Sequence, residues 1–325
     1  MHHSSHGLRI ALLAGASVVA LVAAAPSAGA ADLSKPTLTK APPPAPVARD
    51  TWTWWIEGGA FNTAGGDANL GAPGLGLKPN WGPEGAVGFV WDPIAPMHVV
   101  GQFRYGSASK SQSFALTVAS PTGGTTIKTA GSQNLREDHW LIDFGIGRDF
   151  GLGNTHAMWT LGVRVADLRA KLTANGSFTA TTFTPGIGGT VKTVFKGSFS
   201  AQERTSFVGA GPRFGVQGDI PLGGPWSIDW LAGAAVLFGE RSLQETATAF
   251  GTTTAPRLPV SDSRAVFNLD AQGGLSYWFS PTMKISASYR FDGYWKALKT
   301  FNSAGNVTDI DRFYNGPMVR LTAKF

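Results

Sequence analysis

Cysteine is absent from the sequence, so no disulfide bond contributes to the fold. Long apolar runs are absent too: after residue 30 none reaches the length of about 18 that a membrane-spanning helix needs, which excludes a helical membrane protein. Charged residues make up only 15% of the chain, and the lysines and arginines behind its net charge of +6 are scattered singly. Because nucleic-acid-binding proteins gather such residues into a patch, nucleic acid is not an expected partner.

Histidine is scarce, and three of the six histidines fall within the first six residues. His139 directly follows Asp138, but neighbouring side chains on a strand point to opposite faces, so these two cannot act together. His98 and His156 lie beside short turns. The Gly-x-Ser-x-Gly elbow, zinc-type histidine spacing and glycine-rich phosphate loops are all missing. The sequence therefore predicts no enzyme, no metal site and no cofactor.

The chain begins with the pattern of a secretory signal peptide. A basic residue precedes an apolar run at 10–25, and Ala28-Gly29-Ala30 follows as a small-residue cleavage site. Residues 31–50 then hold a cluster of prolines that no sheet tolerates. We therefore expect a removed signal peptide at 1–30, a Pro-rich periplasmic linker at 31–50 and a folded domain at 51–325.

From residue 52 onwards, polarity alternates with the period of a β-strand. In the last segment Phe313, Leu321 and Phe325 share one face, whereas Arg312 and Arg320 share the other. The same pattern recurs in ten segments: 52–62, 81–91, 97–118, 135–150, 156–175, 204–220, 226–245, 263–279, 282–299 and 312–325. An even number of strands with one apolar face is typical of a transmembrane antiparallel up-and-down β-barrel, and the 11 tryptophans suit its interfacial belts.

The connections between these segments alternate in length. Short turns rich in Gly, Pro or Asp are expected at 92–96, 151–155, 221–225 and 280–281, and long loops at 63–80, 119–134, 176–203, 246–262 and 300–311. This asymmetry is typical of short periplasmic turns and long extracellular loops. Two extended pieces within 176–203 either prolong the fifth and sixth strands beyond the membrane or enter it as a hairpin, which would make twelve strands.

The alternation assigns a face to each side chain. Side chains expected to face lipid are Trp140, Ile142, Phe144, Trp159, Phe214, Trp230, Phe238, Tyr289 and Phe291. Ionisable side chains expected to line the lumen are Glu57, Glu84, Arg104, Asp143, Arg164, Arg213, Asp229, Asp270, Lys284, Arg290, Asp292 and Arg320. They fit two interpretations, a charged channel lining or a network of ion pairs that holds together and partly plugs a narrow barrel.

Several stretches resemble the Legionella-type family of major outer membrane proteins. They are GAGPRFGV at 209–216, PLGGPW at 221–226, LAGAAVLFG at 231–239, and the ending YNGPMVRLTAKF at 314–325, together with 138–150, 159–168 and 268–291. The resemblance implies a pore in the bacterial outer membrane without indicating a solute.

We therefore expect passive, weakly selective passage of ions or small hydrophilic solutes. A non-conducting structural or adhesive barrel, whose extracellular loops bind a partner, is the alternative. Expected partners are outer-membrane lipid and lipopolysaccharide, and the barrel-assembly machinery acting on the C-terminal strand that ends in Phe325. A homo-oligomer with further copies of the chain is compatible with this pattern.

Overall fold

The computed structural model describes residues 51–66, 81–94, 96–120, 124–152, 155–187, 189–249, 252–302 and 305–325. The expected signal peptide and Pro-rich linker lie outside these residues. The part of the chain that the structure describes offers no helix of the length and hydrophobicity that a bilayer crossing requires.

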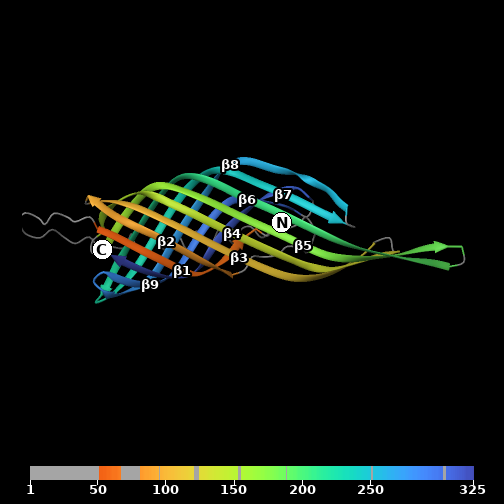
Figure 1. Ribbon diagram of the computed structural model, residues 1–325, viewed down its shortest axis with the longest axis horizontal. Helices are drawn as coiled ribbons and strands as arrows, with labels where there is room; N and C mark the ends of the chain where they lie inside the picture. Colours follow the sequence, from red (N-terminus) through yellow and green to blue (C-terminus); the bar gives the residue numbers. More distant parts are fainter. Residues whose placement is uncertain are drawn as a thin grey trace, which may run out of the picture. The chain divides into compact units, whose positions relative to one another are not determined.

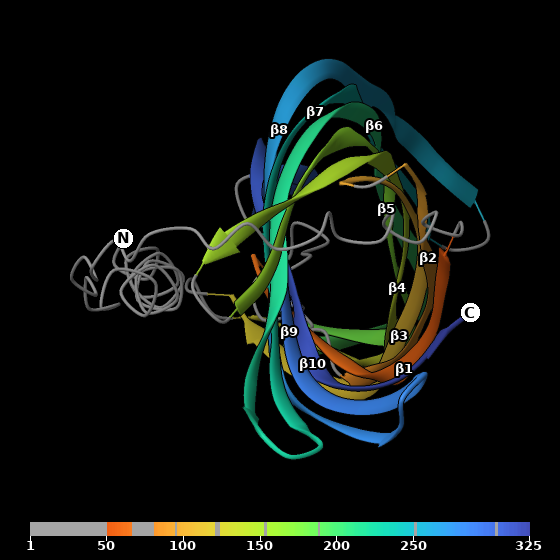
Figure 2. The same cartoon turned by 90° about the vertical axis from the view of Figure 1, so that its left-hand side faces the viewer.

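Ten antiparallel strands form a closed barrel in which each strand pairs with its neighbours in sequence (Figures 1 and 2). The strands are β1 (Thr51–Gly65), β2 (Trp81–Ile94), β3 (Met97–Ala119), β4 (Thr125–Leu152), β5 (Thr155–Gly186), β6 (Gly189–Gly223), β7 (Trp226–Ala249), β8 (Thr252–Ser280), β9 (Met283–Phe301) and β10 (Val307–Lys324). The all-β fold and the number of ten strands are confirmed, and the alternative of twelve is wrong.

The barrel closes where β1 pairs with β10. Trp54 lies opposite Ala323, and at the end of this seam the backbones of Trp52 and Phe325 exchange two hydrogen bonds of 3.1 and 2.8 Å. Closure matters because an unpaired peptide group inside a bilayer costs several kcal/mol, on the order of 5. The C-terminal strand therefore completes the sheet.

The prediction of long loops is wrong for most of the segments concerned, because strands occupy these residues. β4 begins at Thr125, β5 continues to Gly186 and β6 starts at Gly189, and β7 continues to Ala249 and β8 starts at Thr252. The expectation that 176–203 prolongs the fifth and sixth strands is confirmed, and Figure 1 shows this green hairpin reaching well beyond the ring. These segments are rich in Thr, which favours strands. Water reaches both faces of the β5–β6 extension, so it lacks the alternation by which a half-buried strand is recognised.

The outer face carries an apolar band, as the alternation predicted. All nine side chains expected to face lipid point outward. Aromatic rings mark the end of the band at the short turns, where Trp52 stacks on both Trp54 and Trp91, with ring centroids 5.8 and 5.3 Å apart. Such a belt is typical of the membrane interface.

Candidate functional site

The lumen collects ionisable side chains from around the barrel. All twelve residues expected to line it point inward from their strands. Most form ion pairs at the mid-height of the barrel, which we call the central network. It contains five cations and five carboxylates: Arg104, Arg164, Arg213, Arg290 and Arg320 with Glu57, Glu84, Asp143, Asp270 and Asp292.

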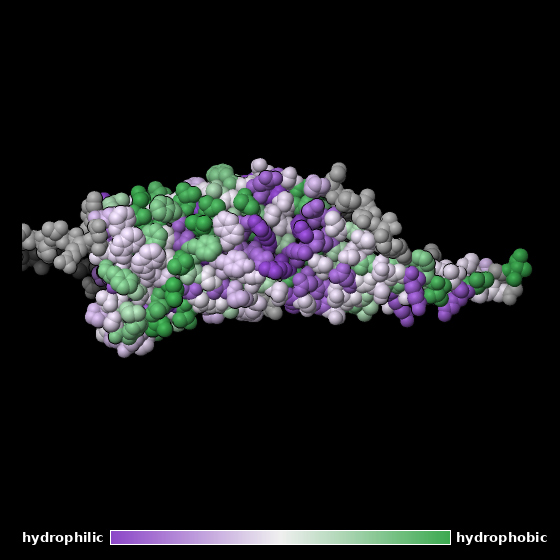
Figure 3. All heavy atoms as spheres, viewed as in Figure 1, coloured by the Kyte–Doolittle hydropathy of each residue, from purple (hydrophilic) through white to green (hydrophobic). Residues whose placement is uncertain are grey.

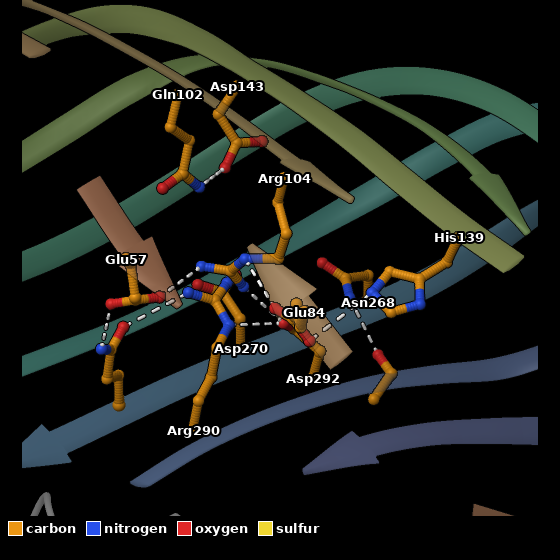
Figure 4. Close-up of polar contacts among 12 residues, drawn as sticks. Glu57, Glu84, Gln102, Arg104, His139, Asp143, Asn268, Asp270, Arg290 and Asp292 are labelled. Carbon is orange, nitrogen blue, oxygen red and sulfur yellow. Dashed lines mark hydrogen bonds and ion pairs between the residues drawn. The ribbon is translucent and has the colours of Figure 1, made fainter. Parts of the chain in front are cut away.

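Arg104 of β3 occupies one half of the central network (Figure 4). Its guanidinium lies 2.8 Å from Glu84, 3.0 Å from Asp292 and 3.4 Å from Glu57, and its side chain is 0% exposed. Arg290 donates a 2.7 Å hydrogen bond to Asp292. A cation surrounded by three carboxylates on β1, β2 and β9 links strands that are far apart in the chain.

Arg164 of β5 occupies the other half. It donates two 2.6 Å hydrogen bonds to both oxygens of Asp143, and a third, of 2.9 Å, to Asp270. Asp270 also accepts a 2.8 Å hydrogen bond from Arg213, and Arg164 reaches Asn268. Two parallel bonds to one carboxylate fix the position of a guanidinium as well as its charge.

The central network fills the cross-section of the barrel. Arg104, Arg164 and Asp270 are all completely buried. Of the two interpretations of the inward charges, the structure shows the network of ion pairs. This outcome follows from size, because a barrel near ten strands is narrow enough for side chains to fill.

A cavity of about 660 Å³ lies between the central network and the short turns, and we call it the vestibule. Arg320 closes its inner side, with its guanidinium 4.2 Å from the centre of the Trp55 ring and 2.8 Å from Glu57. Lys284 pairs with Asp229 at 2.8 Å on the vestibule wall. The vestibule is therefore a polar chamber with both charge signs on its wall.

A hairpin fills the other half of the lumen. β8 pairs with β9 only as far as Phe267 opposite Trp295. Beyond Lys296, whose φ of 55° is strained for a non-glycine residue, β9 pairs with β10 alone. The register also shifts at Asp311, whose carboxylate accepts a 2.7 Å hydrogen bond from the Lys296 backbone. These two irregularities turn residues 297–302 and 305–310 inward, and we call these residues the inward hairpin.

Contacts with the opposite wall hold the inward hairpin. The Lys299 backbone donates a 3.1 Å hydrogen bond to Thr205 of β6, and Thr300 donates one of 2.7 Å to Glu203. Leu298 and Ile310 belong to an apolar cluster inside the barrel. Its other large members are Phe61, Leu141, Leu168, Phe207, Leu237, Val266, Tyr294 and Tyr314.

A second charged group anchors the hairpin to β7 and β8. Arg241 contacts Asp262 at 2.6 Å and Asp309 at 2.9 Å, and it donates a 2.7 Å hydrogen bond to the Lys296 carbonyl. Lys299 lies 3.0 Å from Asp262. Hydrogen bonds from Arg241, helped by those from Lys299, lower the pKa of Asp262 to about 2.

The sequence reasoning missed the inward hairpin and its anchors. The available signal was the loss of alternation after Lys296, where Ala297 to Phe301 are buried on both faces. The histidines are placed as expected relative to their neighbours. His139 points inward, stacks on Tyr314 at 4.2 Å and lies 3.6 Å from Glu84, whereas Asp138 points outward. Among the described residues no cluster could hold a metal ion.

Comparisons with known proteins agree with this architecture. The family model described as the Legionella pneumophila major outer membrane protein precursor matches residues 102–325. No curated protein sequence matches the chain.

Solved barrels resemble it at low identity. The outer membrane protease OmpT from Escherichia coli is 11% identical, with 85% of this chain and 97% of that chain covered, at a TM-score of 0.47. An outer membrane channel from Pseudomonas putida F1 is 10% identical, with 88% and 100% covered, at a TM-score of 0.29. The attachment invasion locus protein Ail of Yersinia pestis is 10% identical, with 84% and 99% covered, at a TM-score of 0.26.

Proposed function

This chain belongs to the Legionella pneumophila major outer membrane protein family of the bacterial outer membrane, and we propose that it forms a gated pore. The pore passes ions or small hydrophilic solutes passively and with weak selectivity. Opening requires the inward hairpin to leave the lumen and the central network to take up water.

The observation that carries this proposal is the polar vestibule leading to a charge-balanced network. A barrel that served only as an anchor could fill its lumen with apolar side chains, at no cost of desolvating ten charges. Arg320 of the central network already lines the vestibule, so water can reach this group first. Water can enter a lumen lined by charged side chains, whereas an apolar core resists hydration.

The inward hairpin suits the role of the moving part. It belongs to the barrel wall only at its base. Its far side is held by polar contacts with Glu203, Thr205 and Arg241 and by the apolar cluster that contains Leu298 and Ile310. A hydrogen bond between neutral groups contributes about 0.5–1.5 kcal/mol, and one to a charged group such as Arg241 or Glu203 about 1.5–3 kcal/mol. Release of the hairpin would leave the ten-stranded wall below Phe267 intact.

Conductance of the purified protein in planar bilayers tests the proposal, and the absence of cysteine permits a tether. Glu203→Cys together with Thr300→Cys places two thiols where the hairpin meets β6. The matched control is Ser111→Cys with Asn134→Cys, a contacting pair between neighbouring wall strands. We expect channel steps in the reduced hairpin pair, their loss on cross-linking and recovery on reduction, with no such change in the control.

Silence of the wild-type protein in repeated preparations would contradict the pore. Unchanged channel steps after complete cross-linking of the hairpin pair would retain a pore but reject this gate.

A surface barrel that binds a partner is the second candidate function. The observation behind it is the β5–β6 extension, whose tip exposes apolar side chains at Phe183, Ile187 and Val191. Shortening this extension would abolish binding of bacteria to a host or surface ligand under the second function, and would leave conductance unchanged under the first.

A further inference from the structure

Three basic residues form a row across the outer face of the barrel. Arg136 of β4 lies directly opposite Lys171 of β5, and Lys171 lies directly opposite Arg204 of β6. All three side chains are exposed and point away from the lumen. We call them the basic row.

The basic row lowers the stability of the sheet. Like charges directly opposite one another destabilise a sheet. Neither Lys171 nor Arg204 forms an ion pair with any residue that the structure describes. Their charges are therefore available to an external anion.

Carboxylates just below the basic row hold two arginines, Arg136 of the row and Arg169 below it. Arg136 is held by Asp138 through hydrogen bonds of 2.9 and 3.2 Å, and Arg169 by Asp167 through hydrogen bonds of 2.9 and 2.5 Å. These pairs orient two guanidinium groups on the outer face, where their remaining N–H groups stay exposed. Both arginine side chains are more than half exposed, at 57% and 65%.

The basic row lies at the height of lipid headgroups. In the same register, Trp140 and Asp167 lie four residues closer to the membrane, and the apolar pair Ile142 and Val165 begins two residues below them. Four residues on a strand tilted by about 40° rise about 10 Å along the barrel axis. Figure 3 shows hydrophilic side chains gathered over β4–β6, next to the apolar band.

We propose that the basic row binds the phosphate groups of the phosphorylated glycolipid in the outer leaflet, the lipid A part of lipopolysaccharide. Arg136 and Arg204 can each form two parallel hydrogen bonds to a phosphate, and Lys171 between them supplies a point charge. The apolar band directly below receives the acyl chains of the same lipid. This site rests on the location of the barrel in the outer membrane and not on its conductance.

The experiment compares two triple variants of the full-length barrel that lose the same charge. The first is Arg136→Gln, Lys171→Gln and Arg204→Gln. The control is Lys128→Gln, Lys192→Gln and Lys196→Gln, three exposed lysines on β4 and β6 of which two lie eight residues beyond the row, about 26 Å along the strand. Native mass spectrometry measures binding of lipid A with its phosphates and of lipid A from which phosphatase has removed them.

We expect the wild-type and control barrels to bind phosphorylated lipid A at least tenfold more tightly than the dephosphorylated form. The basic-row variant should lose this preference while keeping its folded mobility in unheated gels. Millimolar inorganic phosphate should compete weakly, because the lipid is also held by its chains.

Equal binding of both lipids to the wild-type barrel would overturn the proposal. The same loss in both triple variants would also overturn it, since net charge alone would then explain binding. Complete competition by millimolar phosphate would show a site for free anions instead of lipid.

Discussion

Arg104 illustrates how single residues of the lumen depend on one another. Its guanidinium is the shared neighbour of Glu57, Glu84 and Asp292, and all four side chains are buried. Coulomb attraction is strong where water is excluded, but so is the cost of leaving a charge without its counterion. Loss of the cation therefore affects three carboxylates at once.

We expect Arg104→Met to lower the free energy of unfolding by about 3–5 kcal/mol, because it strands buried carboxylates. Urea unfolding of the barrel in phospholipid vesicles without lipopolysaccharide measures this value. Arg136→Met is the matched control, since it removes an exposed arginine paired with Asp138 and should cost less than about 1 kcal/mol. Equal effects of the two substitutions would contradict the importance of the central network.

The inward hairpin shows how one element can fill the lumen of a barrel. β9 and β10 are ordinary wall strands up to Trp295 and from Arg312 onwards. Between them the chain fills the lumen instead of extending the wall. In the gating that we propose, conduction depends on the contacts at Arg241, Glu203 and Thr205 more than on the number of strands.

The charged anchor of the hairpin predicts a pH response. Because hydrogen bonds from Arg241 lower the pKa of Asp262 from 3.8 to about 2, the folded arrangement gains stability from this group above pH 3.8. That gain is lost as the pH falls towards 2. Asp262 stays charged between pH 5 and pH 7, values that lie well above both pKa values, so we expect its titration to leave the frequency of channel opening unchanged in this range.

Asp262→Asn imitates the protonated side chain at neutral pH, so it should raise the opening frequency several-fold in planar bilayers. Asp138→Asn on the outer wall is the control and should have no such effect. An Asp262→Asn protein that opens no more often than the wild type would show that this anchor does not restrain the hairpin.

The whole molecule depends on the seam between its first and last strands. Residues 247 to 271 positions apart pair there, from Gly65 with Arg312 to Thr53 with Lys324, and Phe325 is 75% exposed on the outside of the seam. An exposed terminal aromatic residue contributes little to packing. Its use is better explained by recognition during assembly, and we propose that the barrel-assembly machinery binds the C-terminal strand through it.

Deletion of Phe325 should therefore reduce the amount of folded barrel in the outer membrane of cells by several-fold. Refolding of the same variant from urea into lipid vesicles should stay close to that of the wild type, because one exposed ring and two backbone hydrogen bonds are lost from the seam. A refolding defect as large as the cellular defect would place the role of Phe325 in stability instead.

The sequence by itself determined the strands and their faces. Alternation at Phe313, Leu321 and Arg320 reports which side of a strand meets lipid, and this is a local property with a period of two residues. The same local rule assigned all twelve charged residues of the lumen to the inward face, which is where the structure places them. It failed at residues 125–132 of β4, which were expected to be a loop, because the side chains on both faces are exposed or half-buried there and no apolar side identifies a strand.

Only the tertiary structure decided how the charges pair and where the hairpin lies. Arg104 and Asp292 are 188 residues apart in the chain, and they meet because closure of the ring brings β3 and β9 across the same lumen. The inward hairpin likewise meets the opposite wall, through the hydrogen bond to Thr205 and the apolar cluster that contains Phe207. Local patterns carry no information about distances across a barrel, so both features became visible only when the sheet had closed.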